Sequence, residues 1–414
     1  MDARRGQHRR VRTGGGLALA AVTLGLVTAL GVGSASGAHR SFAHTGASAM
    51  TSNTFVSLLN VCHPGDTNGY RIRGCARNES YTENLSLFSL VDGRRLRTLA
   101  QVPVGRLLRI DTPVGAKDGR ILLTTTTLAP CTVKGAMECG SYVPDSCRNT
   151  ILSLTPGQMR LKRLFAASAD WMIGAAVLSP NGSQVAYSAR PCTGTTPAGG
   201  IFVRDLRTGR TRVIVRTDYC ATVGQPAWNA SGTQVAFPFQ PSRGRPVHGG
   251  LDMGGMWYCP SSPSILTSYG RDLAIASTGT TTTAQSLKLI AADHGCDFDS
   301  VTFDSAALVA LEGCSKRHHH AYGAGANLGN AYVVEYDRQG QRGTRIELPY
   351  RGLNPAFDGS SIETESHGGR ILIAQDQPQD VSYPNYNRVY QLDGTKLTEI
   401  RRYEWGSEFL AIPW

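Results

Sequence analysis

The segments LSPNGSQVAYSA (residues 178–189) and IFVRDLRTGRTRVIVR (residues 201–216) decide the fold of this chain. In both, apolar residues alternate with polar ones on either side of a short turn, which is the pattern of half-buried strands in a hairpin. Pro180 and Gly182 mark the first turn and Gly209 the second, because Pro presets φ and Gly tolerates positive φ. The apolar run WMIGAAVL (171–178) leads into the first turn. The region 171–216 therefore predicts one unit of four antiparallel strands.

The same unit recurs along the chain. Its first two strands return in QPAWNASGTQVAFPF (225–239) and, more loosely, in 301–313, while its second hairpin returns at 85–99, 150–164, 273–290, 331–348 and 387–403. Six hairpins result, centred near residues 93, 157, 209, 280, 340 and 394. Four-stranded units repeating at this spacing are typical of propellers, in which each small sheet needs neighbours to bury its faces. We predict an all-β fold: a single β-propeller of six four-stranded blades, or seven if 42–84 or 239–285 holds another.

Residues 1–38 have the composition of a secretory signal peptide. Five arginines precede an uncharged run with an apolar centre from Leu17 to Val32, and small residues follow up to Ala38. An uncleaved membrane anchor is the alternative, although the apolar centre is short for a membrane span. We therefore expect a signal or anchor in 1–38, a flexible mature N-terminus in 39–53 and the propeller in 54–414, with the protein secreted or at the cell surface.

The charge balance is basic and dispersed. The formal net charge is +11, of which residues 1–38 contribute +4, leaving +7 for the mature part. Weak attraction to acidic polymers or lipids at a cell surface follows from this balance. No basic stripe or recognition motif points to nucleic acid. We expect a monomer that touches the membrane only through an uncleaved N-terminus.

All ten cysteines follow the signal segment, and an even number in an exported chain predicts disulfides that staple the loops. None shows the paired CxxC spacing of a zinc site, so we expect neither a metal nor another cofactor. Nearness along the chain favours the pairs Cys62–Cys75, Cys192–Cys220 and Cys296–Cys314, although sequence alone does not fix the connectivity. The ten are Cys62, Cys75, Cys131, Cys139, Cys147, Cys192, Cys220, Cys259, Cys296 and Cys314.

The repeat resembles a known family. The unit built on LSPNGSQVAY (178–187) and VRDLRTG (203–209) is similar to the TolB-type and related WD-like propeller repeats of bacteria. The family turn reads SPDG, whereas Asn181 stands at the Asp position here. The resemblance covers 80–320 and implies the architecture of the chain. It does not imply a particular function, since such propellers serve many roles.

The long loops are expected on one face of the propeller. If the strands of a blade run outward as A to D, the A–B and C–D turns are short, while the B–C loops are long and hold most cysteines. Binding residues concentrate on long loops held by a rigid scaffold. The candidate binding residues are Trp257 and Tyr258 as aromatic anchors and His318, His320 and Tyr322 in a polar loop.

Motifs of catalysis are missing from the sequence. It contains no G-x-S-x-G elbow and no HExxH, Walker or G-x-G-x-x-G motif, so we name no catalytic residue. Asp297 and Asp299, near Asp304, form the one acid pair of interest, and we interpret them as solvated or turn-capping loop residues. The resulting expectation is a non-catalytic binding or scaffold module for a protein or cell-envelope glycan. The alternative is a carbohydrate-active or peptide-cleaving enzyme on a propeller, which requires titratable groups gathered near the axis.

Overall fold

The fold is described from a computed structural model of the chain. It describes residues 53–64, 79–101, 106–110, 120–129, 143–144, 149–155, 161–168, 171–191, 199–217, 221–241, 247–248, 257–258, 271–291, 296–304, 307–315, 328–349, 352–353, 361–364, 371–375, 386–404 and 412–413. The signal or anchor expected in 1–38 lies outside these residues. Within the described ranges, no helix is long and apolar enough to cross a membrane.

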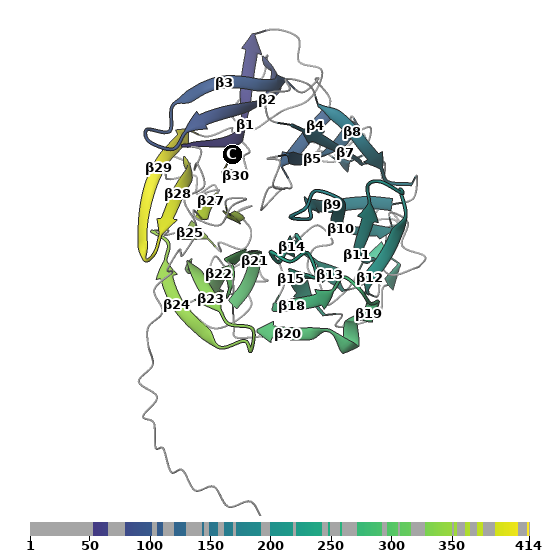
Figure 1. Cartoon of the computed structure of the whole chain (residues 1–414). Coiled ribbons are helices and arrows are strands. Elements are labelled where there is room, and N and C mark those ends of the chain that lie inside the picture. The colour runs from purple at the N-terminus through teal and green to yellow at the C-terminus, as the bar shows by residue number, and fades with distance from the viewer. Residues whose placement is uncertain are drawn as a thin grey trace, which may run out of the picture. The chain divides into compact units, whose positions relative to one another are not determined.

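The described chain is all-β, and six sheets of four or five strands follow one another in sequence (Figure 1). We number these sheets I to VI. Sheet I contains β30 (Ile412–Pro413), β1 (Thr54–Pro64), β2 (Glu79–Ser89) and β3 (Arg95–Gln101). Sheet II contains β4 (Arg106–Ile110), β5 (Ile121–Ala129), β7 (Thr150–Leu154) and β8 (Lys162–Ala166), with β6 (Val143–Pro144) on β5. Sheet III contains β9 (Trp171–Leu178), β10 (Gln184–Pro191), β11 (Gly200–Asp205), β12 (Thr211–Arg216) and β19 (Thr282–Thr283).

The remaining three sheets repeat this order. Sheet IV contains β13 (Thr222–Val223) and β14 (Ala227–Trp228), both on β15 (Gln234–Gln240), then β18 (Asp272–Ser277) and β20 (Lys288–Ala291). Sheet V contains β21 (Cys296–Asp304), β22 (Ala307–Ser315), β23 (Leu328–Tyr336) and β24 (Arg342–Glu347), with β25 (Gly352–Leu353) on β23. Sheet VI contains β26 (Ser361–Thr364), β27 (Ile371–Gln375), β28 (Tyr386–Asp393) and β29 (Lys396–Glu404). A small hairpin pairs β16 (Val247–His248) with β17 (Trp257–Tyr258), and one 3-10 turn covers Ala284–Ser286.

The turn at Ser179 shows why these residues form hairpins. The Ser179 carbonyl accepts from the Gly182 N–H at 2.8 Å, and Gly182 has φ 68°, a conformation that costs glycine little. The Asn181 side-chain oxygen accepts from the Ser183 N–H at 3.0 Å, which closes the loop as an Asp would. The turn lets β9 and β10 pair from Val185 opposite Leu178 onward.

Apolar side chains fill the spaces between neighbouring sheets. Separate buried clusters join sheet II to III, III to IV, IV to V and V to VI, and a further cluster joins sheet I to both II and VI. Trp228 of β14 ties two sheets directly, because its indole N–H donates to the Val177 carbonyl of β9 at 3.2 Å. Each sheet thus buries both faces against neighbours, as the repeat pattern predicts.

Sheet I combines strands from distant parts of the sequence. β30 pairs antiparallel with β1, with Phe55 opposite Pro413 and Val56 opposite Ile412. β30 is therefore the inner strand of sheet I, at the position that β9 and β21 hold in sheets III and V (Figure 1).

Candidate functional site

Two carboxylates lie side by side on β21, the innermost strand of sheet V. Asp297 is 4% exposed and Asp299 is 5% exposed. The interpretation of these acids as solvated loop residues is therefore wrong. The strand begins at Cys296, earlier than the sequence pattern indicated, and it carries both acids into the protein interior.

A β-bulge at Asp299 explains this placement. Phe298 lies opposite Glu312 and Ser300 lies opposite Leu311, so Asp299 is the extra residue on β21. Bulges re-aim side chains and are frequent beside active sites. The sequence carries a signal of this bulge, because the polar positions of CDFDSVTFD change phase between Asp299 and Ser300.

The electrostatics of the pair favour a bound proton. Burial raises the pKa of Asp299 well above its ordinary value, and the neighbouring Asp297 carboxylate raises it further. Among the described residues, the Asp299 Oδ2 atom has no hydrogen-bond partner, and it is buried. A carboxyl group in such surroundings keeps its proton to higher pH and is able to donate it to a bound molecule.

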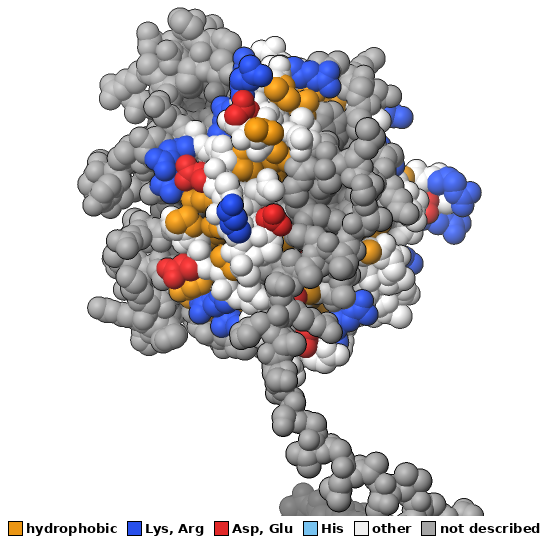
Figure 2. Space-filling model, turned by 60° about the vertical axis from the view of Figure 1, so that its left-hand side comes forward, with side chains coloured by type: hydrophobic (Ala, Val, Ile, Leu, Met, Phe, Trp, Pro, Cys, Tyr) orange, Lys and Arg blue, Asp and Glu red, His pale blue; other side chains and the backbone are white. Residues whose placement is uncertain are grey.

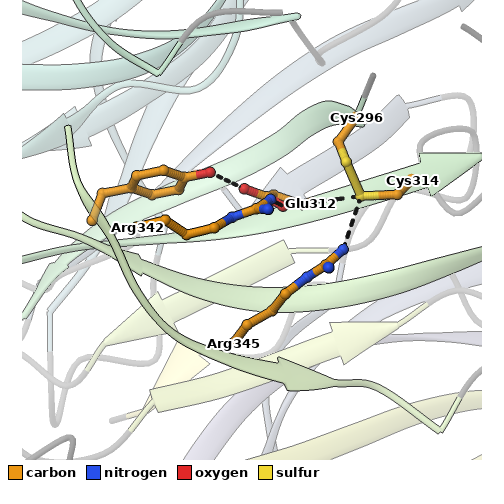
Figure 3. The surroundings of a disulfide bond; sticks show 6 residues. Cys296, Glu312, Cys314, Arg342 and Arg345 are labelled. Carbon is orange, nitrogen blue, oxygen red and sulfur yellow. Dashed lines mark hydrogen bonds and ion pairs between the residues drawn. A yellow bond between two sulfur atoms is a disulfide. The ribbon is translucent and has the colours of Figure 1, made fainter. Parts of the chain in front are cut away.

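A disulfide fixes the beginning of the strand that carries the pair (Figure 3). Cys296 and Cys314 lie opposite each other in the register of β21 and β22, and their sulfur atoms are bonded. Cys296 directly precedes Asp297, so the cross-link restrains the backbone at the acid pair. These sulfurs lie within 4.8 Å of a Glu312 oxygen. Because disulfide sulfurs are not thiolates, we do not assign a metal site here.

Glu312 is a third buried acid of sheet V, but both of its oxygens are already engaged (Figure 3). The Tyr336 hydroxyl donates to Oε1 and the Arg342 guanidinium donates to Oε2. Burial and the adjacent Glu312 carboxylate raise the pKa of Tyr336. Arg345 stacks on the Tyr332 ring, 3.4 Å from its centroid. This arrangement is a satisfied ionic network, in which the Glu312 carboxylate has both a cation and a hydroxyl donor.

The structure describes few of the candidate binding residues. Trp257 and Tyr258 form β17, opposite His248 and Val247, and their side chains lie outside the description. His318, His320 and Tyr322 lie outside the described residues altogether. Cys62 lies in β1, but its side chain is not described. The cysteines that lie outside the described residues are Cys75, Cys131, Cys139, Cys147, Cys192, Cys220 and Cys259.

Comparisons with known proteins find a likeness in structure and none in sequence. No protein-family model and no curated sequence matches the chain. Solved structures do resemble it. Oligogalacturonate lyase from Vibrio parahaemolyticus is 11% identical over 82% of this chain and 78% of that one, with a TM-score of 0.42. The β-propeller domain of the trilobed protease from Pyrococcus furiosus is 12% identical over 71% and 70%, with a TM-score of 0.35. Acylaminoacyl peptidase from Pyrococcus horikoshii is 14% identical over 71% and 39%, with a TM-score of 0.37.

These neighbours correct the functional expectation. They are β-propeller proteins, in agreement with the predicted architecture, and they are enzymes or parts of enzymes. The expectation of a non-catalytic binding or scaffold module is thereby contradicted. It rested on missing sequence motifs, and no such motif detects a pair of buried carboxyl groups. At these identities the likeness concerns fold alone, so the nature of any reaction has to be argued from the site itself.

Proposed function

We propose that the chain is a β-propeller enzyme that cleaves glycosidic bonds of a cell-envelope polysaccharide, with Asp299 as proton donor and Asp297 as its acidic partner. The observation that carries this proposal is the pair of buried carboxylates on the innermost strand of sheet V. Titratable groups gathered at the inner end of a blade are the feature that separates a propeller enzyme from a binding module.

The chemistry of a glycosidic bond matches what this pair offers. Cleavage requires a proton for the leaving oxygen, and it commonly uses two carboxyl groups, of which one is protonated before the reaction. The raised pKa of Asp299 means that this carboxyl group keeps its proton to higher pH than an exposed Asp, as a proton donor must. Asp297 lies two residues earlier on the same strand, where a carboxylate stabilises positive charge that develops on the sugar ring.

The finer description of the fold belongs to the same proposal. We infer that sheets I to VI are six four-stranded blades of one closed propeller, related to the TolB-type repeat proteins. Supporting features are the shared apolar clusters between neighbouring sheets and the pairing of β30 with β1. In this proposal residues 1–38 direct export, 39–53 link to the propeller, and the monomer acts outside the cell or at its surface on a glycan.

The test is an activity assay with matched variants. The purified chain is incubated with a panel of soluble envelope polysaccharides, and cleavage is followed by new reducing ends. Asp299→Asn should lower kcat by at least about 100-fold, as expected for loss of a general acid, and Asp297→Asn should also be impaired. Asp304→Asn is the control, because Asp304 lies on the same strand and is only partly buried.

Three outcomes oppose the proposal. Cleavage of none of the glycans overturns it, and so does peptide cleavage without glycan cleavage. Equal activity of Asp299→Asn and Asp304→Asn removes Asp299 from the reaction. The pH profile adds a separate criterion, since loss of the proton donor should abolish the fall of the wild-type rate at alkaline pH.

A further inference from the structure

Six exposed basic side chains lie on sheets II and III, and we call this set the basic rim. Its members are Lys162 and Arg163 of β8, Arg207 and Arg210 of the turn between β11 and β12, and Arg212 and Arg216 of β12. All six are exposed. The two sheets are joined beneath them, because the Arg204 guanidinium of β11 lies 4.9 Å from the centroid of the Phe165 ring of β8.

The charges of the basic rim are not neutralised by neighbouring acids. In the part of the chain that the structure describes, none of the six residues forms an ion pair. The carboxyl group in this hairpin, Asp205, accepts from both the backbone N–H and the hydroxyl of Thr208, at 2.7 and 2.9 Å. Those hydrogen bonds are the main reason that the pKa of Asp205 is lowered, and attraction to Arg207 adds to them.

Some basic residues elsewhere in the described chain are paired with acids. On sheet VI, Arg388 and Arg402 both pair with Glu399, at 3.7 and 3.1 Å. Figure 2 shows the side of the molecule nearer β24 and β29, where basic side chains stand among acidic ones. In β8 and in the hairpin of β11 and β12, the six cations of the basic rim stand against one carboxylate, Asp205, and such an excess attracts a polyanion.

The composition of the rim favours a hydrated polymer over a membrane. Surfaces that bind bilayers combine basic residues with apolar side chains that insert. The exposed large hydrophobic residues of the described chain are Val91, Leu96 and Leu289, and none belongs to the basic rim. Five of the six cations are Arg, whose planar guanidinium binds carboxylate and phosphate groups in bidentate fashion. From Arg210 to Arg216 the strand spans about 20 Å, enough for several sugar units.

We propose that the basic rim is a binding surface for an acidic polysaccharide, separate from the Asp297–Asp299 pair. It holds the polymer by its carboxylate or phosphate groups across β8 of sheet II and β12 of sheet III. This binding does not depend on the proposed cleavage reaction.

The test measures binding of fluorescein-labelled alginate, a carboxylated polysaccharide, to the full chain over a series of salt concentrations. Neutral dextran is the uncharged probe. The variant Arg210→Gln/Arg212→Gln/Arg216→Gln should bind alginate on the order of 100-fold more weakly, taking roughly 1 kcal/mol for each basic residue at an anionic surface. It should also show a shallower dependence of affinity on salt.

The matched control is Arg94→Gln/Arg95→Gln/Arg97→Gln, which removes three equally exposed cations from sheet I. It should bind within about threefold of wild type. Equal weakening in both triple variants would show that net charge alone acts, and would overturn the proposal. Binding to anionic lipid vesicles but not to alginate would overturn it as well. Asp299→Asn should bind normally, which separates this inference from the proposed reaction.

Discussion

Replacing Arg342 with Met should expose how strongly sheet V depends on its buried ionic network. The side chain of Glu312 is fully buried, and it receives hydrogen bonds from the Arg342 guanidinium and the Tyr336 hydroxyl. Removing the cation leaves a buried carboxylate without its counter-charge, which costs about 3–5 kcal/mol. Because the side chain of Arg342 is 35% exposed, water reaches the site and the lower end of about 3 kcal/mol applies.

The measurement is the free energy of unfolding in urea, with Arg345→Met as the control. Arg345 also belongs to β24, but it stacks on Tyr332 at the surface, so its loss should cost about 1 kcal/mol or less. Adding Glu312→Gln to Arg342→Met removes the uncompensated charge and should recover part of the loss. The reasoning fails if the double variant is no more stable than Arg342→Met, or if both Arg variants are equally destabilised.

Three further outcomes follow from sheet V. The raised pKa of Asp299 means that its stabilising contribution is complete below the pKa of the unfolded chain and is lost as the pH rises through the folded pKa. Asp299→Asn should therefore lose less stability than wild type when urea midpoints are compared from acidic to alkaline pH. Cys296→Ser/Cys314→Ser opens a cross-link of sequence separation 18 and should cost about 3 kcal/mol by denaturant unfolding, whereas an unchanged midpoint would deny the bond a structural role. Gly340→Ala should lower the melting temperature, because Gly340 has φ 86° and an added Cβ would lie 1.9 Å from a carbonyl oxygen of β20. Gly343→Ala should leave the melting temperature unchanged, because the nearest atom to its added Cβ is at 3.5 Å.

The regular part of the fold was accessible from the sequence because its signals are local. The turn at Gly182 and the hairpin at Gly209 combine period-two alternation with residues that tolerate the turn geometry, and both occur in the structure. The same signals located β18 and β20 of sheet IV and β28 and β29 of sheet VI. A strand of two residues such as β30 has no period to detect, so its pairing with β1 was not predicted.

The candidate site was only half accessible. Asp297 and Asp299 were noticed as a pair, but period-two reasoning assumes an uninterrupted strand, and the bulge at Asp299 breaks that assumption. Whether an acid lies in a loop or in the interior depends on contacts between sheets, which no local pattern contains. The Glu312 network was missed for the same reason, since its members come from β22, β23 and β24.

The pairing of β30 with β1 has a consequence for how the protein assembles. Sheet I is a three-stranded sheet until residues 412–413 reach it, so its completion joins parts of the chain that are remote in sequence. Contacts of such high separation form late, because the intervening chain must first be ordered. The contact between β30 and β1 consists of a two-residue pairing, so sub-global opening should begin at this contact. Adjacent amides of β1 point alternately to β2 and to β30, so in hydrogen exchange we expect whichever of the Phe55 and Val56 amides faces β30 to lose protection before the amides of the central strands of sheets III and V.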